Sequence, residues 1–212
     1  MIRRIIFDLD NTLMVWDNDY YVTLDQTFKY FNISYDENIK NRLIDVVNDY
    51  EDKHNIFKYE YMYELMKQYS NIDLPSNFVE KWIEYLGSAV PSDKDLELID
   101  TLEYLSNKYE LVVLTNWFTK SQKERLKNYD ILKYFKEIIG TDLVKNKPNK
   151  ESYIKACGPY KPFECIMIGD SLEKDVNDAL NCGLNAILFD YKDKYDGEIQ
   201  KVKKISDLKN IL

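Results

Sequence analysis

The chain has 212 residues, with 29 basic and 37 acidic side chains and a formal net charge of −8 at pH 7. A 45% hydrophobic and 31% charged composition is that of a folded globular protein with a real core. The net acidity argues against nucleic acid or an anionic membrane surface as a partner. The single histidine, His54, excludes metal sites built from several histidines, so any chemistry must rest on carboxylates, hydroxyls and amines.

The first predicted element is a strand at residues 2–7, which two aspartates follow. A short continuous apolar run is typical of a parallel strand buried on both faces. Asp8 and Asp10 come directly after it and point to the same side, because side chains alternate along an extended chain. Two like charges this close require a shared cation or proton. The alternative is an Asp-rich turn that Asn11 and Thr12 complete.

Residues 16–87 come next and carry helical periodicity without a convincing strand. The clearest apolar stripe in this stretch consists of Val79, Trp82, Ile83 and Leu86. We therefore predict an inserted all-helical subdomain at 16–87, with residues 1–15 and 88–212 forming the remaining domain.

A helix at residues 98–109, a strand at 111–114 and a helix at 121–126 follow the insert. Thr115 and Asn116 stand where this strand ends, so a hydroxyl and backbone N–H groups precede a helix and favour an anion there. The alternative is that both residues simply cap the helix.

Residues 138–140 form a weaker strand candidate, and Lys147 follows it. Pro148 is suited to the first position of the next helix, since its missing N–H costs nothing there. Lysines at such positions are more often solvated surface charges, so Lys147 carries little weight alone.

The last predicted elements are strands at residues 165–168 and 186–189, separated by a helix at 172–180. Asp170 follows the first of these strands, and Asp175 lies in the first turn of the helix. Acidic residues at a helix start need no function by themselves. Asp170, however, falls at the carboxyl end of a strand, as Asp8 does.

Strands that alternate with helices predict an α/β fold, a Rossmann-like doubly wound parallel sheet. Sites in such folds lie beyond the carboxyl ends of the strands. The fold therefore gathers the singled-out residues at one edge of the sheet. These residues are Asp8, Asp10, Thr115, Asn116, Lys147, Asp170 and Asp175.

This ordered set resembles the haloacid dehalogenase-like hydrolase superfamily over essentially the whole chain. The matching motifs are Asp8-Leu9-Asp10-Asn11-Thr12, Thr115-Asn116, Lys147-Pro148 and Gly169-Asp170-Ser171 with Asp175. The helical insert between the first and second motifs looks like the C1-type cap of that superfamily.

The resemblance implies that Asp8 attacks the phosphorus of a phosphate ester and forms an aspartyl-phosphate. Asp10 would protonate the leaving group and then activate the hydrolytic water. Thr115, the Asn116 amide and Lys147 would hold the phosphate oxygens.

The resemblance also implies Mg²⁺ as the cofactor, bound by the carboxylates of Asp8 and Asp170 and by the backbone carbonyl of Asp10. Asp175 would be a further ligand or would orient the others. Charge counting agrees, because these four carboxylates against Lys147 would repel a phosphate unless a divalent cation were bound.

Asp10 separates the activities within the superfamily, because a departing halide needs no proton and the dehalogenases lack this aspartate. We predict a phosphatase acting on a small phosphorylated metabolite of the nucleotide, sugar phosphate or phosphoglycolate type. The stretch Thr115-Asn116-Trp117-Phe118 with Gln122 and Leu126 looks like the nucleotidase and small phosphomonoesterase branch, which typically has glycine where Trp117 stands.

The alternatives are a phosphomutase or other phosphotransferase with the same intermediate, a haloacid dehalogenase and a phospho-accepting signalling domain. A signalling domain of that kind lacks a helical insert of this length.

The insert is expected to set substrate choice, because access to the sheet edge passes beneath it. Aromatic residues near the motifs could stack on a base or sugar. They are Trp16, Tyr20, Tyr21, Trp117 and Phe118. His54 is expected to be a solvated or loop histidine rather than a catalytic one.

The three cysteines, Cys157, Cys165 and Cys182, are odd in number and lack CxxC spacing, which argues against disulfides or a zinc knuckle. The apolar run before Asp8 is too short for a signal peptide, and no segment approaches the roughly 20 apolar residues of a membrane span. We expect a cytoplasmic protein with no membrane association, and the sequence indicates no obligate protein partner.

Overall fold

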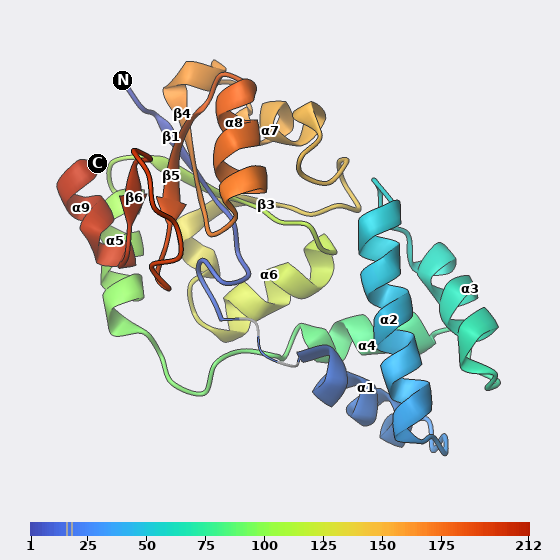
Figure 1. The fold of residues 1–212 in the computed structure, drawn as a ribbon. Helices are drawn as coiled ribbons and strands as arrows, with labels where there is room; N and C mark the ends of the chain where they lie inside the picture. Colours follow the sequence, from blue (N-terminus) through green and yellow to red (C-terminus); the bar gives the residue numbers. More distant parts are fainter. Residues whose placement is uncertain (16, 18) are drawn as a thin grey trace.

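The computed structural model describes residues 1–15, 17 and 19–212, which form two lobes (Figure 1). The sheet lobe contains six strands that pair in parallel in the order β3-β2-β1-β4-β5-β6. The fold class predicted from the sequence, α/β with a parallel sheet, is confirmed. The strands are β1 (Arg4–Phe7), β2 (Glu110–Leu114), β3 (Phe135–Ile139), β4 (Cys165–Gly169), β5 (Asn185–Phe189) and β6 (Lys201–Val202).

Burial on both faces explains why the strands read as continuous apolar runs. In β1, Ile5 and Phe7 pack into the core on one face, and Ile6 packs into the core on the other. All five predicted strands are present. The sequence missed β6, because an edge strand of two residues, Lys201–Val202, is too short to show a pattern.

Helices cover both faces of the sheet, as a doubly wound fold requires. The face of Ile5 and Phe7 is covered by α5 (Leu96–Ser106), α6 (Thr119–Asn128) and α9 (Leu208–Ile211). The opposite face is covered by α7 (Lys150–Cys157) and α8 (Asp178–Asn181). None of the helices in the described ranges is long and apolar enough to cross a membrane.

The helical lobe consists of α1 (Asp19–Tyr30), α2 (Glu37–Lys53), α3 (Tyr59–Ser70) and α4 (Phe78–Leu86). It has a hydrophobic cluster of its own, to which Trp117 and Phe118 contribute from the loop after β2. The lobe is therefore anchored to the sheet lobe by aromatic residues that directly follow Thr115-Asn116.

Two local expectations were wrong or incomplete. Pro148 does not begin a helix: α7 begins at Lys150, where the Asn149 side chain accepts a hydrogen bond from the Glu151 amide at 3.0 Å. The helix expected at 172–180 is a π-helix at Leu172–Asn177, which continues into α8. A wide helical turn thus follows β4, and it carries Asp175.

Candidate active site

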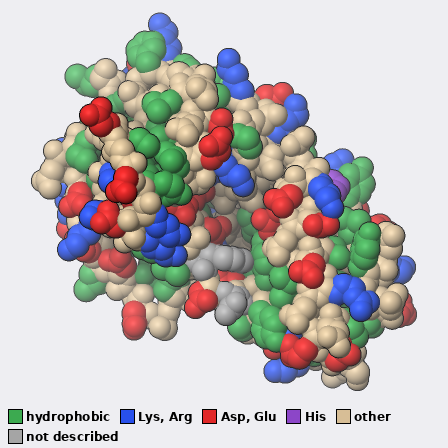
Figure 2. All heavy atoms as spheres, in the orientation of Figure 1, with side chains coloured by type: hydrophobic (Ala, Val, Ile, Leu, Met, Phe, Trp, Pro, Cys, Tyr) green, Lys and Arg blue, Asp and Glu red, His purple; other side chains and the backbone are tan. Residues whose placement is uncertain are grey.

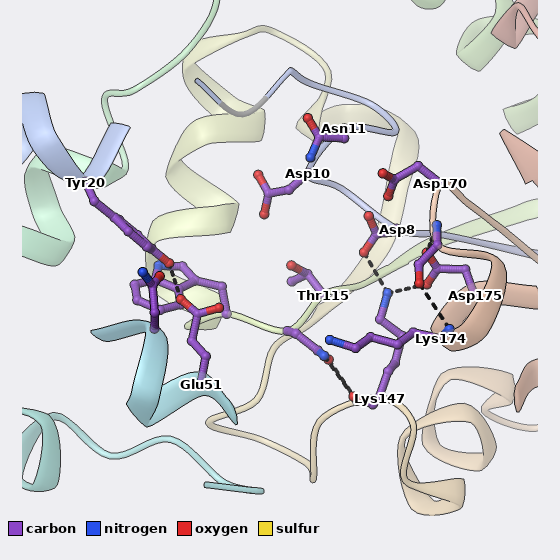
Figure 3. A pocket seen from close by; sticks show the side chains of 14 residues that line it. Asp8, Asp10, Asn11, Tyr20, Glu51, Thr115, Lys147, Asp170, Lys174 and Asp175 are labelled. Carbon is purple, nitrogen blue, oxygen red and sulfur yellow. Dashed lines mark hydrogen bonds and ion pairs between the residues drawn. The ribbon is translucent and has the colours of Figure 1, made fainter. Parts of the chain in front are cut away.

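The seven residues singled out in the sequence line one cleft of about 360 Å³ between the two lobes. Figure 2 shows the hollow between the lobes, and Figure 3 shows the side chains that line it. Both lobes contribute to the lining. The lining residues are Asp8, Asp10, Asn11, Tyr20, Asn48, Glu51, Thr115, Asn116, Trp117, Lys147, Asp170, Ser171, Lys174 and Asp175.

Asp8 lies at the carboxyl end of β1 and is only 8% exposed. Its Oδ1 accepts a hydrogen bond from Lys147 Nζ at 2.6 Å, and its Oδ2 accepts one from the Thr12 hydroxyl at 3.3 Å. Burial raises the pKa of the Asp8 carboxyl to about 8; the Lys147 ammonium opposes this shift, and the Asp175 carboxylate adds to it. The site therefore holds a carboxylate whose charge is costly to maintain.

Lys147 joins two carboxylates, since its Nζ also lies 2.6 Å from Asp175 Oδ1. It is 3% exposed. Burial acts to lower the pKa of the Lys147 ammonium, but the carboxylates of Asp175 and Asp8 outweigh it, so the pKa lies above its usual value. Lys147 is a buried, charged and doubly paired cation, not the solvated lysine that its position alone favoured.

Three carboxylates could hold a metal ion together. Asp8, Asp170 and Asp175 each offer an oxygen, and these oxygens lie within 4.8 Å of one another. Burial, and next the neighbouring Asp175 carboxylate, raise the pKa of Asp170. Closely packed, acceptor-only oxygens of this kind are the donors that hard divalent cations prefer.

Gly169 explains how Asp175 reaches this cluster. A Cβ built at Gly169 would lie 2.3 Å from the Asp175 carboxyl carbon, so only glycine leaves room for that side chain against the end of β4. Asp175 Oδ2 then accepts a hydrogen bond from the Ser171 amide at 3.1 Å. The Gly-Asp pair after β4 serves packing as well as chemistry.

The side chain of Asp10 lies against α6. Its Oδ2 accepts a hydrogen bond from Gln122 Nε2 at 2.7 Å, and its Oδ1 pairs with Arg125. Gln122 Nε2 also donates to the Thr115 hydroxyl at 2.9 Å, and Arg125 donates to Gln122 Oε1 at 3.0 Å. Gln122 and Arg125 are both buried, so α6 fixes the orientation of Asp10.

Sequence reasoning missed Arg125 entirely. Its Nε donates to the carbonyl of Ala89 at 2.8 Å, and its NH2 lies 3.7 Å from Asp19 Oδ2. Ala89 follows α4 and Asp19 begins α1, so Arg125 contacts both places where the chain passes between the lobes. The available signal was a pair of polar residues, Gln122 and Arg125, one turn apart beside the apolar Leu126.

The charge count made from the sequence was incomplete for the same reason. It balanced four carboxylates against Lys147 alone. In the structure Arg125 pairs with Asp10, and Glu51 and Lys174 also line the cleft. The cleft lining alone thus presents five carboxylates and two ammonium groups.

Asn116 positions Lys147 through its side chain. Asn116 Nδ2 donates to the Lys147 carbonyl at 2.9 Å, and the Lys147 amide donates to Asn116 Oδ1 at 2.8 Å. At the start of α6, the amide and the hydroxyl of Thr119 both donate to Asp142 Oδ1 at 2.7 Å. The anion at that helix start is thus the protein's own Asp142.

The helical lobe contributes Tyr20, Asn48 and Glu51, of which the sequence analysis named only Tyr20. The Tyr20 hydroxyl donates to Glu51 Oε1. Burial raises the pKa of Glu51 to about 7; the hydrogen bond from Tyr20 opposes this shift, and the Asp10 carboxylate adds to it. Trp117 is 4% exposed and packs against Tyr20, with 5.2 Å between the ring centroids.

Two other aromatic candidates, Tyr21 and Phe118, do not line the cleft. Phe118 is buried in the core of the helical lobe, and the Lys40 ammonium lies over the Tyr21 ring at 3.4 Å. His54 follows α2 and stacks on Tyr50 with 4.3 Å between centroids. Trp16 lies outside the residues that the structure describes.

The model of one protein family, the haloacid dehalogenase-like hydrolases, matches residues 5–189. The chain belongs to this family. It is 32% identical over 91 residues to N-acylneuraminate-9-phosphatase of Mus musculus, covering 42% of this chain and 37% of that protein. It is 30% identical over 123 residues to glyceraldehyde 3-phosphate phosphatase of Methanothermobacter thermautotrophicus, covering 52% and 54% respectively. The matches thus span only about a third to a half of these relatives.

Solved structures of the family share the whole fold. The HAD-hydrolase YfnB from Bacillus subtilis bound to magnesium has a TM-score of 0.72 at 18% identity, covering 99% of this chain and 98% of that one. The HAD phosphatase from Thermococcus onnurineus has a TM-score of 0.68 at 23% identity, covering 99% and 97%. The 2-haloacid dehalogenase from Pseudomonas syringae has a TM-score of 0.72 at 18% identity, covering 100% and 98%. Solved phosphatases and dehalogenases resemble this chain to a similar degree, so the fold alone does not distinguish between the two reactions.

Proposed function

We propose that the protein is a Mg²⁺-dependent phosphatase that hydrolyses a small phosphorylated metabolite through an aspartyl-phosphate on Asp8. The observation that carries this proposal is Asp10, a second carboxylate that follows Asp8 by two residues and lines the same cleft. The alkoxide that leaves a phosphate ester needs a proton, whereas a halide does not. The relatives named as phosphatases of N-acylneuraminate 9-phosphate and glyceraldehyde 3-phosphate support the same reaction class.

The domain boundaries belong to this proposal. We assign residues 16–87 to the cap and residues 1–15 and 88–212 to the catalytic core. Helices α1 to α4 all fall within the first range and share one hydrophobic cluster. The cleft lies where the two parts meet, so substrate would enter beneath the helical lobe.

In the first step, a carboxylate oxygen of Asp8 attacks the phosphorus, and the bond from phosphorus to the leaving oxygen breaks. The leaving oxygen takes a proton from Asp10. In the second step, Asp10 accepts a proton from water as the water oxygen attacks the phosphorus. The bond between phosphorus and Asp8 then breaks, and inorganic phosphate is released.

The surrounding residues hold these two carboxylates in place. Gln122 and Arg125 fix Asp10, and Thr12 and Lys147 contact the two oxygens of Asp8. We assign binding of the phosphate oxygens to Lys147, the Thr115 hydroxyl and the Asn116 amide, which all lie in the cleft lining.

Asp8, Asp170 and Asp175 fit a Mg²⁺ ion, because three carboxylates converge within 4.8 Å and burial makes the charges of Asp8 and Asp170 costly. We assign the Asp8 and Asp170 carboxylates and the Asp10 backbone carbonyl as ligands. Asp175, which already accepts hydrogen bonds from Lys147 and Ser171, would be a ligand or would orient the others. A bound Mg²⁺ would neutralise charge on the phosphate oxygens.

Purified protein can be assayed on p-nitrophenyl phosphate with Mg²⁺, with EDTA and as the Asp8→Asn variant. We expect EDTA to abolish activity, excess Mg²⁺ to restore it, and Asp8→Asn to lower kcat by at least about 10³-fold. Equal activity in Asp8→Asn would remove the nucleophile assignment. Chloride release from 2-chloropropionate without phosphatase activity would assign the protein to the dehalogenases instead.

A further inference from the structure

The cleft has a second end, which the helical lobe builds. Figure 3 shows Tyr20 and Glu51 across the cavity from Asp170 and Asp175, with Asp10 and Thr115 between them. The metal-binding candidates and Lys147 occupy one end, where the phosphate would bind. The leaving group of the substrate would therefore extend toward Tyr20 and Glu51.

Two polar groups at this end have no hydrogen-bond partner within the described part of the chain. Tyr20 donates its hydroxyl to Glu51 Oε1, but Glu51 Oε2 has no hydrogen-bond partner among the residues that the structure describes. The side-chain amide of Asn48 has none within the same set. Asn48 and Glu51 lie one turn apart on α2 and both line the cleft, so a single ligand can reach both.

These groups define the chemistry of a matching ligand. A carboxylate only accepts hydrogen bonds, whereas a side-chain amide both donates and accepts. Neighbouring hydroxyls satisfy both, since one can donate to Glu51 and another can accept from Asn48. A substrate carboxylate brings no donor for Glu51 and adds a like charge beside it.

The charge at the helical end of the cleft points the same way. Asp8 and Asp175 pair with Lys147, and Asp10 pairs with Arg125, whereas no ion pair of Glu51 is found among the described residues. Lys174 is exposed at the cleft surface. A second anionic group on the substrate, placed beside Glu51, would therefore meet the negative charge of this carboxylate.

We propose that Glu51 and Asn48 form a leaving-group subsite that selects phosphate esters of small uncharged polyols over those of hydroxy acids. This inference rests on the proposed function, since it names the alcohol that the reaction releases. Trp117, packed against Tyr20, walls this end of the cleft and restricts it to small leaving groups.

The test compares glycerol 3-phosphate with 3-phosphoglycerate, which share a carbon skeleton and differ by a hydroxymethyl group against a carboxylate. We expect kcat/KM to favour glycerol 3-phosphate by at least about tenfold, because the acid places a like charge beside Glu51 and brings one hydroxyl donor fewer. Glu51→Gln removes the charge with little change in shape. It should reduce this ratio by about tenfold or more.

Two further variants keep the test decisive. Asp52→Asn makes the same charge change at the next residue of α2, which is exposed and does not line the cleft, so the ratio should stay at its wild-type value. Asn48→Ala alters an exposed side chain that the fold does not need. It should lower kcat/KM for glycerol 3-phosphate about threefold to tenfold by removing one hydrogen bond.

The outcomes separate this inference from the proposed function. Activity on p-nitrophenyl phosphate with equal or lower efficiency on glycerol 3-phosphate than on 3-phosphoglycerate would overturn the subsite alone. An unchanged ratio in Glu51→Gln would also overturn it. No activity on p-nitrophenyl phosphate in the presence of Mg²⁺ would overturn the proposed function itself.

Discussion

The two ends of the cleft differ in how their polar groups are satisfied. At the sheet end, Asp8, Asp10 and Asp175 each accept hydrogen bonds or ion pairs from buried side chains or from the backbone. At the helical end, Glu51 Oε2 and the Asn48 amide have no hydrogen-bond partner among the described residues. Carboxylates paired in this way are held rigidly and suit a reaction step that does not vary. Open groups on a separate lobe suit a choice among substrates, so the two ends separate catalysis from selection.

The largest expected effect comes from removing the cation that pairs with the carboxylates at the sheet end of the cleft. Lys147→Ala leaves the buried Asp8 and Asp175 carboxylates facing each other without their shared cation. We expect kcat to fall by about 10³-fold and the free energy of unfolding to fall by about 3 kcal/mol. Phosphatase assays and chemical denaturation would measure both effects.

Lys145→Ala is the matched control, because Lys145 is two residues away and pairs with Glu151 at the surface. Activity and stability should stay near wild type. If Lys147→Ala behaved like this control, the paired cluster would have no part in the reaction.

A second substitution weakens the contacts that orient Asp10 but keeps a positive charge beside it. Arg125→Lys keeps the positive charge but cannot reproduce the contacts with Asp10, Gln122 and Ala89 together. Because Asp10 is assigned to protonate the leaving oxygen, kcat for glycerol 3-phosphate should fall about 10 to 100-fold. For p-nitrophenyl phosphate, whose leaving group needs no proton, the loss should be smaller.

Lys127→Ala, on an exposed position of the same helix, should leave both rates unchanged. Equal losses of Arg125→Lys on the two esters would mean that Arg125 supports the fold and not the orientation of Asp10.

The metal cluster offers a sharper probe of the same end. In Gly169→Ala, the added Cβ meets the Asp175 carboxyl group, which must move away from the oxygens of Asp8 and Asp170. We expect the Kd for Mg²⁺, measured by calorimetry, to rise about tenfold, as for the loss of a residue that orients metal ligands. Unchanged Mg²⁺ affinity in a folded variant would place Asp175 outside the metal site.

The smallest expected effect belongs to the helical end and depends on pH. The pKa of Glu51 is raised to about 7, so its charge is present above this pH and is lost below it. The charged and polar groups that shift this pKa besides burial are Tyr20, Asp10 and Lys174, which line the cleft, and the neighbouring Asp52, which does not. The preference for glycerol 3-phosphate over 3-phosphoglycerate should therefore grow severalfold from pH 6 to pH 8. In Glu51→Gln, this preference should not change with pH. If it rose as in the wild-type protein, the titrating group would be a different residue.

Much of the fold and of the sheet end could be predicted from the sequence. Strands β1, β2, β4 and β5 are continuous apolar runs because helices bury both of their faces. The chemistry-bearing residues directly follow strand ends or begin a helical turn, and a parallel sheet brings those positions to one edge. This reasoning correctly predicted that Asp8, Thr115 and Asp170 lie together, since all three line the cleft.

The remaining residues act through contacts that no local pattern shows. Arg125 meets Asp10 across 115 positions of sequence, and its helix otherwise looks like an amphipathic one. Glu51 and Asn48 lie among many polar residues of α2 and differ from them only in facing the cleft. Pro148 shows that a strong local preference can also mislead, because the helix begins two residues later, at Lys150.

The contacts of Arg125 couple Asp10 to the segments that connect the two lobes. Its guanidinium contacts Asp10, the carbonyl of Ala89 and the carboxylate of Asp19, so the catalytic carboxylate and both chain crossings share a single side chain. Coupling through a shared element is reciprocal. If substrate binding changes the contacts of Arg125 with Ala89 and Asp19, a change in those contacts alters the pairing of Arg125 with Asp10 by the same free energy. The orientation of Asp10 and the relative position of the two lobes would then be coupled through this one side chain.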